Sequence, residues 1–414
     1  MRNGAYLGLV AVSLVAGCAA GGGTGRANTA QGPDGGGDAS ALVQLGAPPA
    51  NLRVHHWATF TVFHAVAGQQ YVPGVGRSEE TLPPFVHGLA APALGPPLAK
   101  VQTAGAFFDA DTAGDAQVEL RVPHGEVGAD WPPLAQKWAG GAGAQPDQPA
   151  VWQLHVEPDT AKLAALPAVE PNSVWQSLRQ AGAARVSALG QTAGSDDLLF
   201  YRALGDFVPP LRVTAKKQGG SQGYEGTLTN DGDEEIPRAW LLHLHEGGGL
   251  MQPLKSVPAH GSIVFSPTPK EMWPYYAAQV QSTLTAELQN AGLTPPEAAA
   301  LVASFTHNWL KTYGLRILIL APKSWADAHL QTTVTPKPAA EVRVVLGRIE
   351  LLTEQDEAAM LDQLKVAAQT NDSGILQALG FFAEPKARRA QLVATDPAVQ
   401  ALAAQLVSQA AKLQ

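Results

Sequence analysis

A single cysteine, Cys18, stands in the whole chain of 414 residues. Because one thiol cannot form a disulfide within the chain, the folded state must be stabilised by burial of apolar side chains. The composition suits this, since 45% of the residues are hydrophobic and nine are tryptophan. We therefore expect proper hydrophobic cores, in a chain long enough for two or three domains.

Cys18 follows an uncharged apolar run at 7–17, LGLVAVSLVAG, which is too short for a permanent membrane helix and is typical of an export signal. The four residues Val15-Ala16-Gly17-Cys18 resemble the lipobox of bacterial lipoproteins, whose cysteine is acylated and becomes the mature N-terminus. The resemblance implies a signal peptide at 1–17 and lipidation of Cys18. The alternative is an ordinary secretory signal with a free cysteine, or a weak membrane anchor.

The segment that follows the cysteine is rich in glycine and has almost no large apolar residue. Residues 18–50 are therefore expected to form a flexible tether. In the lipoproteins that this chain resembles, an aspartate directly after the cysteine favours retention in the inner membrane, and Ala19 stands there instead. The resemblance thus implies an outer-membrane lipoprotein, facing the periplasm or the cell surface. The lipid is the membrane contact that we expect.

The charge of the chain bears on its partners. The formal net charge is −8, and no cluster of lysine and arginine is interleaved with aromatic residues. Nucleic acid and polyanionic surfaces are therefore not expected as partners. The sequence also lacks GxSxG, SxxK, phosphate-loop and GxGxxG motifs, which removes the most recognisable enzyme classes.

Hydrophobic periodicity predicts an α+β fold. Residues 51–160 read as a β-rich domain, because 58–66 and 116–123 alternate apolar and polar side chains with a period of two. Residues 161–270 read as a helix near 172–184 followed by a β-sandwich domain. Its strands are expected at 198–204, 211–217, 223–230, 238–246 and 262–267, with the polar segment 229–237 as a hairpin turn.

The C-terminal part is expected to become helical. Residues 271–352 read as a mixed α/β segment, with a helix that begins at the capping box of Thr294 and Glu297 and strands at 315–322 and 341–352. Residues 353–414 read as a helical region, in which a helix begins after Thr353 and another after Asp396. The apolar stripe of that last helix is expected to pack on its own domain rather than on a partner.

His243 and His245 are candidate metal ligands, because residues two apart on a strand project from the same face. His260 is the candidate third ligand for a Zn²⁺ ion. The competing interpretation is an amphipathic strand whose polar side carries the histidines. No cofactor is expected under that interpretation. Two acidic segments are interpreted as turns rather than as ion sites: 109–115 as an acidic hairpin turn instead of a calcium loop, and 231–235 as a solvated turn.

Three stretches of the chain, at 98–135, 196–213 and 309–357, resemble a family of large exported bacterial proteins found in myxobacteria and planctomycetes. The resemblance implies a multidomain, envelope-associated product and supplies no catalytic residues. If it marks a shared site, Tyr201-Arg202, Arg343 and Arg348 are the residues to inspect. An arginine within an apolar strand must find a carboxylate or carbonyl partner, so a bridging role in the structure is the competing interpretation.

These observations favour a lipid-anchored envelope protein with a non-enzymatic binding or structural role, acting through protein or glycan contacts. The alternative is a metal-dependent hydrolase that uses His243 and His245. A carbohydrate-binding role would require exposed aromatic side chains, and the sequence does not show which of the nine tryptophans are exposed.

Overall fold

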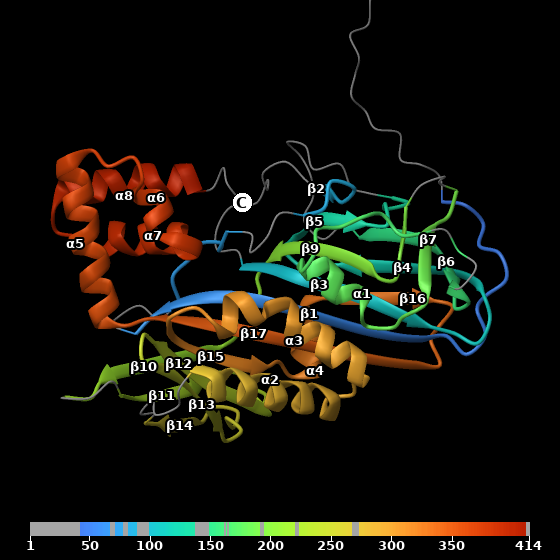
Figure 1. Cartoon of the computed structure of the whole chain (residues 1–414), viewed down its shortest axis with the longest axis horizontal. Coiled ribbons are helices and arrows are strands. Elements are labelled where there is room, and N and C mark those ends of the chain that lie inside the picture. Colours follow the sequence, from blue (N-terminus) through green and yellow to red (C-terminus); the bar gives the residue numbers. More distant parts are fainter. Residues whose placement is uncertain are drawn as a thin grey trace, which may run out of the picture. The chain divides into compact units, whose positions relative to one another are not determined.

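The computed structural model describes residues 42–66, 71–77, 82–88, 99–136, 149–160, 163, 165–190, 194–219, 223–266 and 273–410, and Figure 1 shows the whole chain. The predicted signal peptide, the lipobox with Cys18, and most of the predicted tether lie outside the described residues. The described residues belong to a compact unit that extends from Ala39 to Gln414.

The described strands form three sheets, and the largest has nine strands. In spatial order they are β13 (Gly248–Leu254), β12 (Arg238–His245), β15 (Gly314–Leu320), β17 (Ala340–Leu352), β1 (Arg53–Ala65), β3 (Ala99–Asp109), β9 (Leu199–Gly205), β5 (Glu126–Trp131) and β2 (His87–Gly88). The pairing of β1 with β17 is parallel, and the other strand pairings in this sheet, among the described residues, are antiparallel. The sheet therefore joins segments almost 300 residues apart.

Two smaller sheets complete the β structure of the described chain. The five-stranded sheet has the order β16 (Gln331–Thr335), β4 (Gly114–Arg121), β6 (Ala150–Glu157), β7 (Arg185–Ala188) and β8 (Ser195–Asp196). The three-stranded sheet has the order β10 (Leu211–Lys217), β11 (Tyr224–Asn230) and β14 (Ser262–Phe265).

The helices lie mainly in the second half of the described chain. They are α1 (Val174–Arg179), α2 (Trp273–Asn290), α3 (Pro295–Leu310), α4 (Lys323–His329), α5 (Glu354–Thr370), α6 (Ile375–Ala378), the 3₁₀ helix η2 (Gly380–Phe382), α7 (Ala383–Val393) and α8 (Pro397–Ala410). Figure 1 shows α5 to α8 gathered at one end of the nine-stranded sheet. None of the described helices combines the length and apolar content needed to cross a membrane.

Both faces of the nine-stranded sheet are covered. One face shares a hydrophobic core with the two smaller sheets, to which Phe60 of β1 and Trp152 of β6 contribute. The other face packs against α1, α2 and α3, with Trp57 of β1 and Leu284 of α2 in that second core. A third core joins the C-terminal helices to the end of β1 around Phe63. Burial on both faces explains why β1, whose alternating sequence at 58–66 is typical of a strand with one buried face, is buried along nearly all of its length.

The α+β class is confirmed, with sheets packed face to face in the N-terminal and middle regions and helices at the C-terminus. The nine-stranded sheet takes strands from 51–160, 161–270 and 271–352 alike, so it crosses the expected boundaries near 160 and 270. The hairpin predicted at 229–237 is wrong, because β11 and β12 belong to different sheets. The acidic segment at 109–115 likewise connects two sheets, since β3 and β4 do not pair.

The helices α3 and α5 begin at threonine residues whose side chains cap them. Thr294 Oγ1 accepts a hydrogen bond from the Glu297 backbone N–H, and Glu297 Oε2 accepts one from the Thr294 N–H at 2.8 Å. This confirms the predicted capping box. Glu297 also binds His55 Nδ1 of β1 at 2.8 Å, which ties the start of α3 to the sheet. Thr353 caps α5 as predicted.

Candidate functional site

The predicted metal ligands His243 and His245 lie together near the end of β12, with ring centroids 5.6 Å apart. His243 is buried, because the nine-stranded sheet is covered on both faces, and the edge of its ring meets Tyr224 at a centroid distance of 5.0 Å. Burial lowers the pKa of His243 to about 4, with further lowering by His245, Lys217 and Arg316. His243 is therefore a neutral side chain near pH 7.

His260 does not join this pair. Its Nε2 lies 2.9 Å from Asp233 Oδ1 in the loop after β11, and His245 Nδ1 accepts a hydrogen bond from the Gly247 N–H at 3.1 Å. The part of the chain that the structure describes holds no group of three or more His, Cys, Asp or Glu side chains arranged to bind a metal. The three histidines therefore do not converge into the predicted Zn²⁺ site.

The acidic segments are occupied by contacts within the protein. Asp109 and Asp111 both accept from Arg53, at 2.8 and 3.3 Å, and Asp115 binds His155 Nδ1 at 2.8 Å. In the second segment Asp231 forms an ion pair with Arg212 at 2.5 Å. These carboxylates hold loops to neighbouring strands.

The expected partners of the strand arginines are present. Arg343 of β17 donates to the Leu330 carbonyl at 2.6 Å and lies 3.1 Å from Asp327, so it joins β17 to α4. Tyr201 is buried, and its hydroxyl lies 2.5 Å from His56 Nε2. The prediction that such arginines find carboxylate or carbonyl partners is confirmed for Arg343, and the partners of Arg348 are described next.

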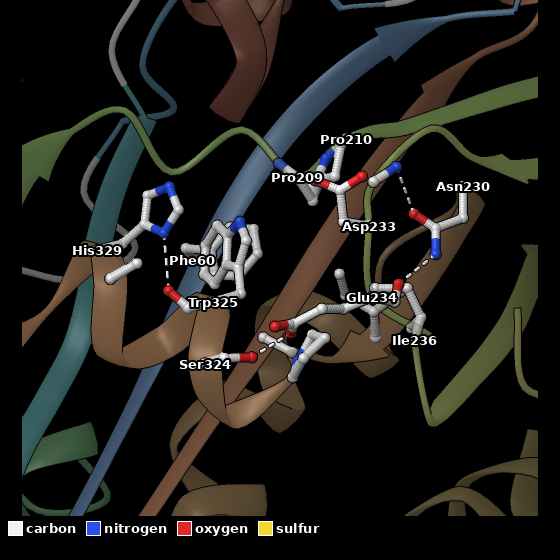
Figure 2. Close-up of a pocket in the computed structure, with 15 residues that line it drawn as sticks. Phe60, Pro209, Pro210, Asn230, Asp233, Glu234, Ile236, Ser324, Trp325 and His329 are labelled. Atoms are coloured by element: carbon white, nitrogen blue, oxygen red, sulfur yellow. Dashed lines mark hydrogen bonds between the residues drawn. The ribbon is translucent and has the colours of Figure 1, made fainter. Parts of the chain in front are cut away.

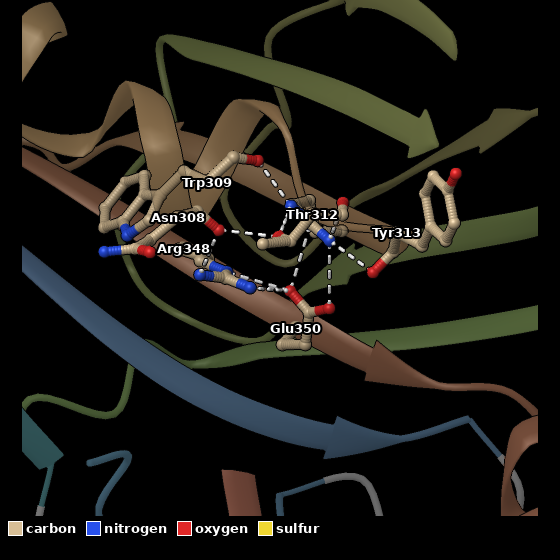
Figure 3. Close-up of polar contacts among 7 residues, drawn as sticks. Asn308, Trp309, Thr312, Tyr313, Arg348 and Glu350 are labelled. Carbon is tan, nitrogen blue, oxygen red and sulfur yellow. Dashed lines mark hydrogen bonds and ion pairs between the residues drawn. The ribbon is translucent and has the colours of Figure 1, made fainter. Parts of the chain in front are cut away.

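Arg348, Glu350 and Arg316 form a buried ion-pair cluster. Figure 3 shows Arg348 and Glu350 near the end of α3. Glu350 Oε2 lies 2.7 Å from Arg348 Nη2 and 3.1 Å from Arg316 Nε. Burial lowers the pKa of Arg316 to about 10, against the opposing effect of Glu350, so its guanidinium remains charged at neutral pH.

The same cluster terminates α3. Arg316 donates to the Trp309 carbonyl, to the Thr312 carbonyl at 2.8 Å and to the Tyr313 carbonyl at 3.0 Å. Arg348 donates to the Asn308 carbonyl at 3.2 Å. Positive charge at a helix C-terminus satisfies the free carbonyl groups and opposes the negative end of the helix dipole. Arg316 therefore has a structural role that needs no ligand.

A cavity of about 510 Å³ lies beside this cluster, between the end of α3, the ends of β1 and β17, and the helices α5 to α7. We call it the arginine cavity. Its wall includes the charged side chains Arg348, Glu350, Asp356 and Lys386, and the aromatic side chains Phe63, Tyr313, Phe381 and Phe382.

A second hollow, of about 250 Å³, lies where α4 crosses the junction between the nine-stranded and three-stranded sheets. We call it the Trp325 cleft. Its lining is mainly apolar and aromatic: Phe60, Pro209, Pro210, Ile236, Ile319, Ala321, Pro322, Trp325, Ala328 and His329. The cleft is thus built from β1, β15, α4 and the loops that flank β10 and β11.

The aromatic side chains of this cleft are stacked. Trp325 and His329 lie one turn apart on α4 with ring centroids 4.1 Å apart and planes at 22°, and Phe60 meets Trp325 at 5.2 Å. His329 Nδ1 donates to the Trp325 carbonyl at 2.7 Å, which fixes the imidazole orientation. Figure 2 shows Phe60 and Trp325 near the middle of the cleft, with His329 on one side and Asp233 and Glu234 on the other.

The described tryptophan side chains differ in their exposure to solvent. The side chains of Trp57, Trp131, Trp152, Trp175, Trp240 and Trp309 are buried, whereas Trp325 is half-buried. Trp138 and the side chain of Trp273 lie outside the described residues. Among the tryptophan side chains that the structure describes, Trp325 alone is therefore available to a ligand.

The polar rim of the Trp325 cleft is acidic. Asp233 and Glu234 line it, and the Asp233 side chain is 95% exposed. Ser324 donates to Glu234. Because Ser324 is bonded to a carboxylate and His329 to a backbone carbonyl, these two side chains do not form a nucleophile and base pair.

Sequence reasoning missed Trp325, Arg316 and Lys386. Nothing in the local pattern of the short helix α4 distinguishes Trp325 from the buried tryptophans. Arg316 stands inside the predicted strand 315–322, where an arginine in an apolar run is a signal for a buried partner. Lys386 gives no such signal, since its surroundings come from three different parts of the chain.

No family model matches the chain, and no curated protein matches it. A solved structure of the yeast delta-COP-I mu-homology domain with a Dsl1 WxWxV peptide is similar at a TM-score of 0.26 and 9% identity, covering 74% of this chain and 97% of that one. A second structure of that yeast domain gives a TM-score of 0.23, with the same identity and coverage. Similarity at this level carries no argument about fold or function.

Proposed function

We propose that this protein is a lipid-anchored protein of the cell envelope that acts by binding, and that the Trp325 cleft holds an extended, proline-containing segment of a partner protein. The proposal has two parts. The anchor rests on the lipobox resemblance at Cys18, and the binding site rests on the half-buried Trp325 stacked in an apolar cleft with an acidic rim.

The shape and lining of the cleft favour a proline-containing segment. Such segments adopt the polyproline II conformation before binding, and they dock in grooves lined by aromatic side chains at a low cost in conformational entropy. Trp325 and Phe60 provide an aromatic surface of this kind, and Pro209 and Pro210 form part of the opposite wall. The small volume suits one or two side chains of an extended chain rather than a large ligand.

The charge of the rim favours a basic residue beside the prolines. Asp231, Asp233, Glu234 and Glu235 follow one another in the loop after β11. Arg212 forms an ion pair with Asp231, and His260 Nε2 lies 2.9 Å from Asp233 Oδ1. The loop therefore keeps an excess of negative charge, which attracts a basic partner and speeds its association.

A glycan ligand and a metal-dependent hydrolysis are both less well supported. The cleft wall is mainly apolar, whereas a sugar presents many hydroxyl groups that need polar partners. His243 and His245 have no third protein ligand among the described side chains. A binding role through protein contacts is therefore the function that the geometry supports best.

The binding part is tested with a synthetic peptide, RALPPLP, titrated into the full-length Cys18→Ala protein. We expect saturable binding that weakens as salt is added, because the basic residue faces the acidic rim. The matched peptides EALPPLP and RALAALA should bind at least about tenfold more weakly, since each removes one of the two features. Equal binding of the three peptides, or binding of soluble glycan chains in place of RALPPLP, would contradict the proposal.

Variants locate the binding to the cleft. Trp325→Ala should weaken RALPPLP binding by about tenfold or more, which is the loss expected of an aromatic anchor. Ala328→Arg serves as the second variant, because Ala328 lies exposed in the cleft, and we expect an exposed helix position to accept a larger side chain. Its new charge should repel the peptide. Tyr275→Ala on α2, where the side chain is 66% exposed, is the control and should bind normally.

The anchor is tested separately, by fractionation and mass spectrometry. Wild-type protein should sediment with membranes and carry acyl chains on Cys18, whereas the Cys18→Ala variant should not. Multiple acyl chains give stable attachment at ~0.8 kcal/mol per buried CH₂. A bare thiol on the membrane-associated protein, or unchanged sedimentation of the variant, would remove the anchor from the account.

A further inference from the structure

The arginine cavity carries a second inference, which does not depend on the Trp325 cleft. Its volume of about 510 Å³ lies within the range typical of small-molecule sites. It combines charged and aromatic side chains from β17, α5, η2 and α7. The charged groups of its wall differ in whether they have hydrogen-bond or ion-pair partners within the protein.

The carboxylates of the cavity wall already accept hydrogen bonds from other residues of the protein. Glu350 Oε1 accepts from Arg316 at 3.3 Å, and Glu350 Oε2 accepts from Arg348 Nε at 2.8 Å. Asp356 Oδ2 accepts from the Thr353 hydroxyl at 2.7 Å, at the start of α5. Each of these carboxylates therefore already accepts a hydrogen bond from another residue of the protein.

The ammonium group of Lys386 is different. It donates one hydrogen bond, to the Leu379 carbonyl at 3.0 Å, and no carboxylate of the described residues lies within ion-pair distance of it. Two of its three donors thus remain for a ligand. Burial lowers the pKa of Lys386, and the opposing effects of Glu350 and Asp356 come from charges that do not contact it.

The charges around the cavity do not balance. Arg348 and Lys386 of the wall, together with the fully buried Arg316 behind it, supply three positive charges, and Glu350 and Asp356 of the wall supply two negative ones, which leaves an excess of one positive charge. A ligand with a single negative charge would neutralise this excess. Such a ligand would be held most strongly where the site is shielded from water.

The aromatic side chains of the wall indicate which kind of body the ligand carries beside its negative charge. Phe382 lies 5.0 Å from Phe63 in centroid distance and 4.7 Å from Phe381, and Arg348 lies 5.0 Å above the Phe382 ring. These rings give an apolar surface beside the cations. We propose that the arginine cavity binds a small monocarboxylate with an aromatic or branched apolar body, whose carboxylate pairs with Lys386 and whose body packs on Phe381 and Phe382.

Calorimetry on the full-length Cys18→Ala protein tests this proposal with two probes of nearly equal shape, phenylacetate and the neutral phenylacetamide. We expect saturable binding of phenylacetate at least tenfold tighter than that of phenylacetamide. Equal binding of the two probes, or no saturable binding of phenylacetate, would overturn the proposal. This comparison uses the unaltered cavity, so it does not depend on the folding of a variant.

Variants then assign the charge. Lys386→Met keeps the apolar stem and should weaken phenylacetate binding at least tenfold, while binding of phenylacetamide stays the same. Lys386→Arg should restore most of the preference for the acid. Lys365→Met, at an exposed position of α5, is the matched control and should bind as wild type does. Unchanged phenylacetate binding by Lys386→Met would contradict the assignment.

Discussion

Arg316 and Glu350 form an ion pair in the protein interior, with Arg316 Nε 3.1 Å from Glu350 Oε2 and side chains that are 0% and 9% exposed. The pair connects neighbouring strands β15 and β17, and Arg316 also holds the carbonyl groups at the end of α3. Two charges leave water for this pair, so its value depends on both partners being present. This contact therefore joins the C-terminal end of α3 to the sheet.

Removing one partner of this pair should be costly. We expect Arg316→Met to lower the free energy of unfolding by about 3 to 5 kcal/mol, because Glu350 loses a buried partner and the α3 carbonyls lose a donor. Urea unfolding measures this. Arg121→Met is the control, since Arg121 pairs with Glu119 at the surface and its loss should change stability by about 0.5 kcal/mol or less. Similar losses in the two variants would contradict the account.

His64 should make the fold sensitive to acid. It is fully buried, neither ring nitrogen has a hydrogen-bond partner among the described residues, and burial lowers its pKa from 6.5 to about 4. In the unfolded chain the His64 side chain therefore binds a proton below pH 6.5, whereas in the folded protein it does so only below about pH 4. Stability falls as the pH decreases through this window, and the contribution of His64 reaches about 3 kcal/mol at its lower end.

The measurement is urea unfolding at several pH values between 7 and 4. His64→Leu removes the titrating group, so the loss of stability between these limits should be smaller by about 3 kcal/mol than in wild type. His307→Leu is the control, because His307 is exposed on α3 and is solvated in both states. Parallel curves for wild type and His64→Leu would show that His64 does not carry this dependence.

The capping box of α3 should have a measurable value. Thr294→Ala removes the hydroxyl that accepts from the Glu297 N–H, and we expect a loss of about 1 kcal/mol in the free energy of unfolding. Thr294→Ser keeps the hydroxyl and should retain most of the stability. Glu297→Ala should cost more than Thr294→Ala, since it also removes the bond to His55. The idea fails if serine and alanine at 294 are equally destabilising in chemical denaturation.

Gly347 connects the sheet to the Trp325 cleft. A Cβ atom at this position would lie 2.3 Å from Phe60 Cζ, and Phe60 packs on Trp325. Gly347→Ala should therefore destabilise the fold by about 1 to 3 kcal/mol and also weaken binding in the cleft. Gly128→Ala is the matched strand control, because its Cβ would meet nothing closer than 4.0 Å. Thermal unfolding and RALPPLP titration of both variants decide this.

The sequence predicts those helices whose first residues carry a recognisable capping pattern. The helices α3 and α5 begin at threonine caps, and α8 begins at Asp396-Pro397, as expected. The long helix α2 was missed, although Tyr276, Val280, Leu284 and Leu288 recur every four residues on its buried face. That period is a helix signal, but the segment between these residues is polar and has no recognisable cap.

Pairing between distant strands could not be predicted. The Asp-Gly turn at 231–232 signals a change of direction, yet the strands on its two sides join different sheets. Local propensity does not report which strand becomes the neighbour, so the parallel pairing of β1 with β17 is also invisible to it.

The candidate sites depend on that long-range pairing. His243 and His245 were predicted from strand period alone, and the period does place them together. The period does not show that both faces of β12 are covered by other elements. His243 is therefore buried instead of lying on an outer polar face. Trp325 becomes a cleft residue because Pro209, Ile236 and Ile319 arrive from three other segments.

The most direct test of the proposed function is an NMR titration of ¹⁵N-labelled tryptophan indole groups with the RALPPLP peptide. The account predicts that the Trp325 indole resonance shifts and saturates, while those of the buried Trp57, Trp152 and Trp240 stay in place. The assignment comes from loss of one resonance in Trp325→Phe. A saturating titration that moves a different indole, or no shift at Trp325 at any peptide concentration, would contradict the account.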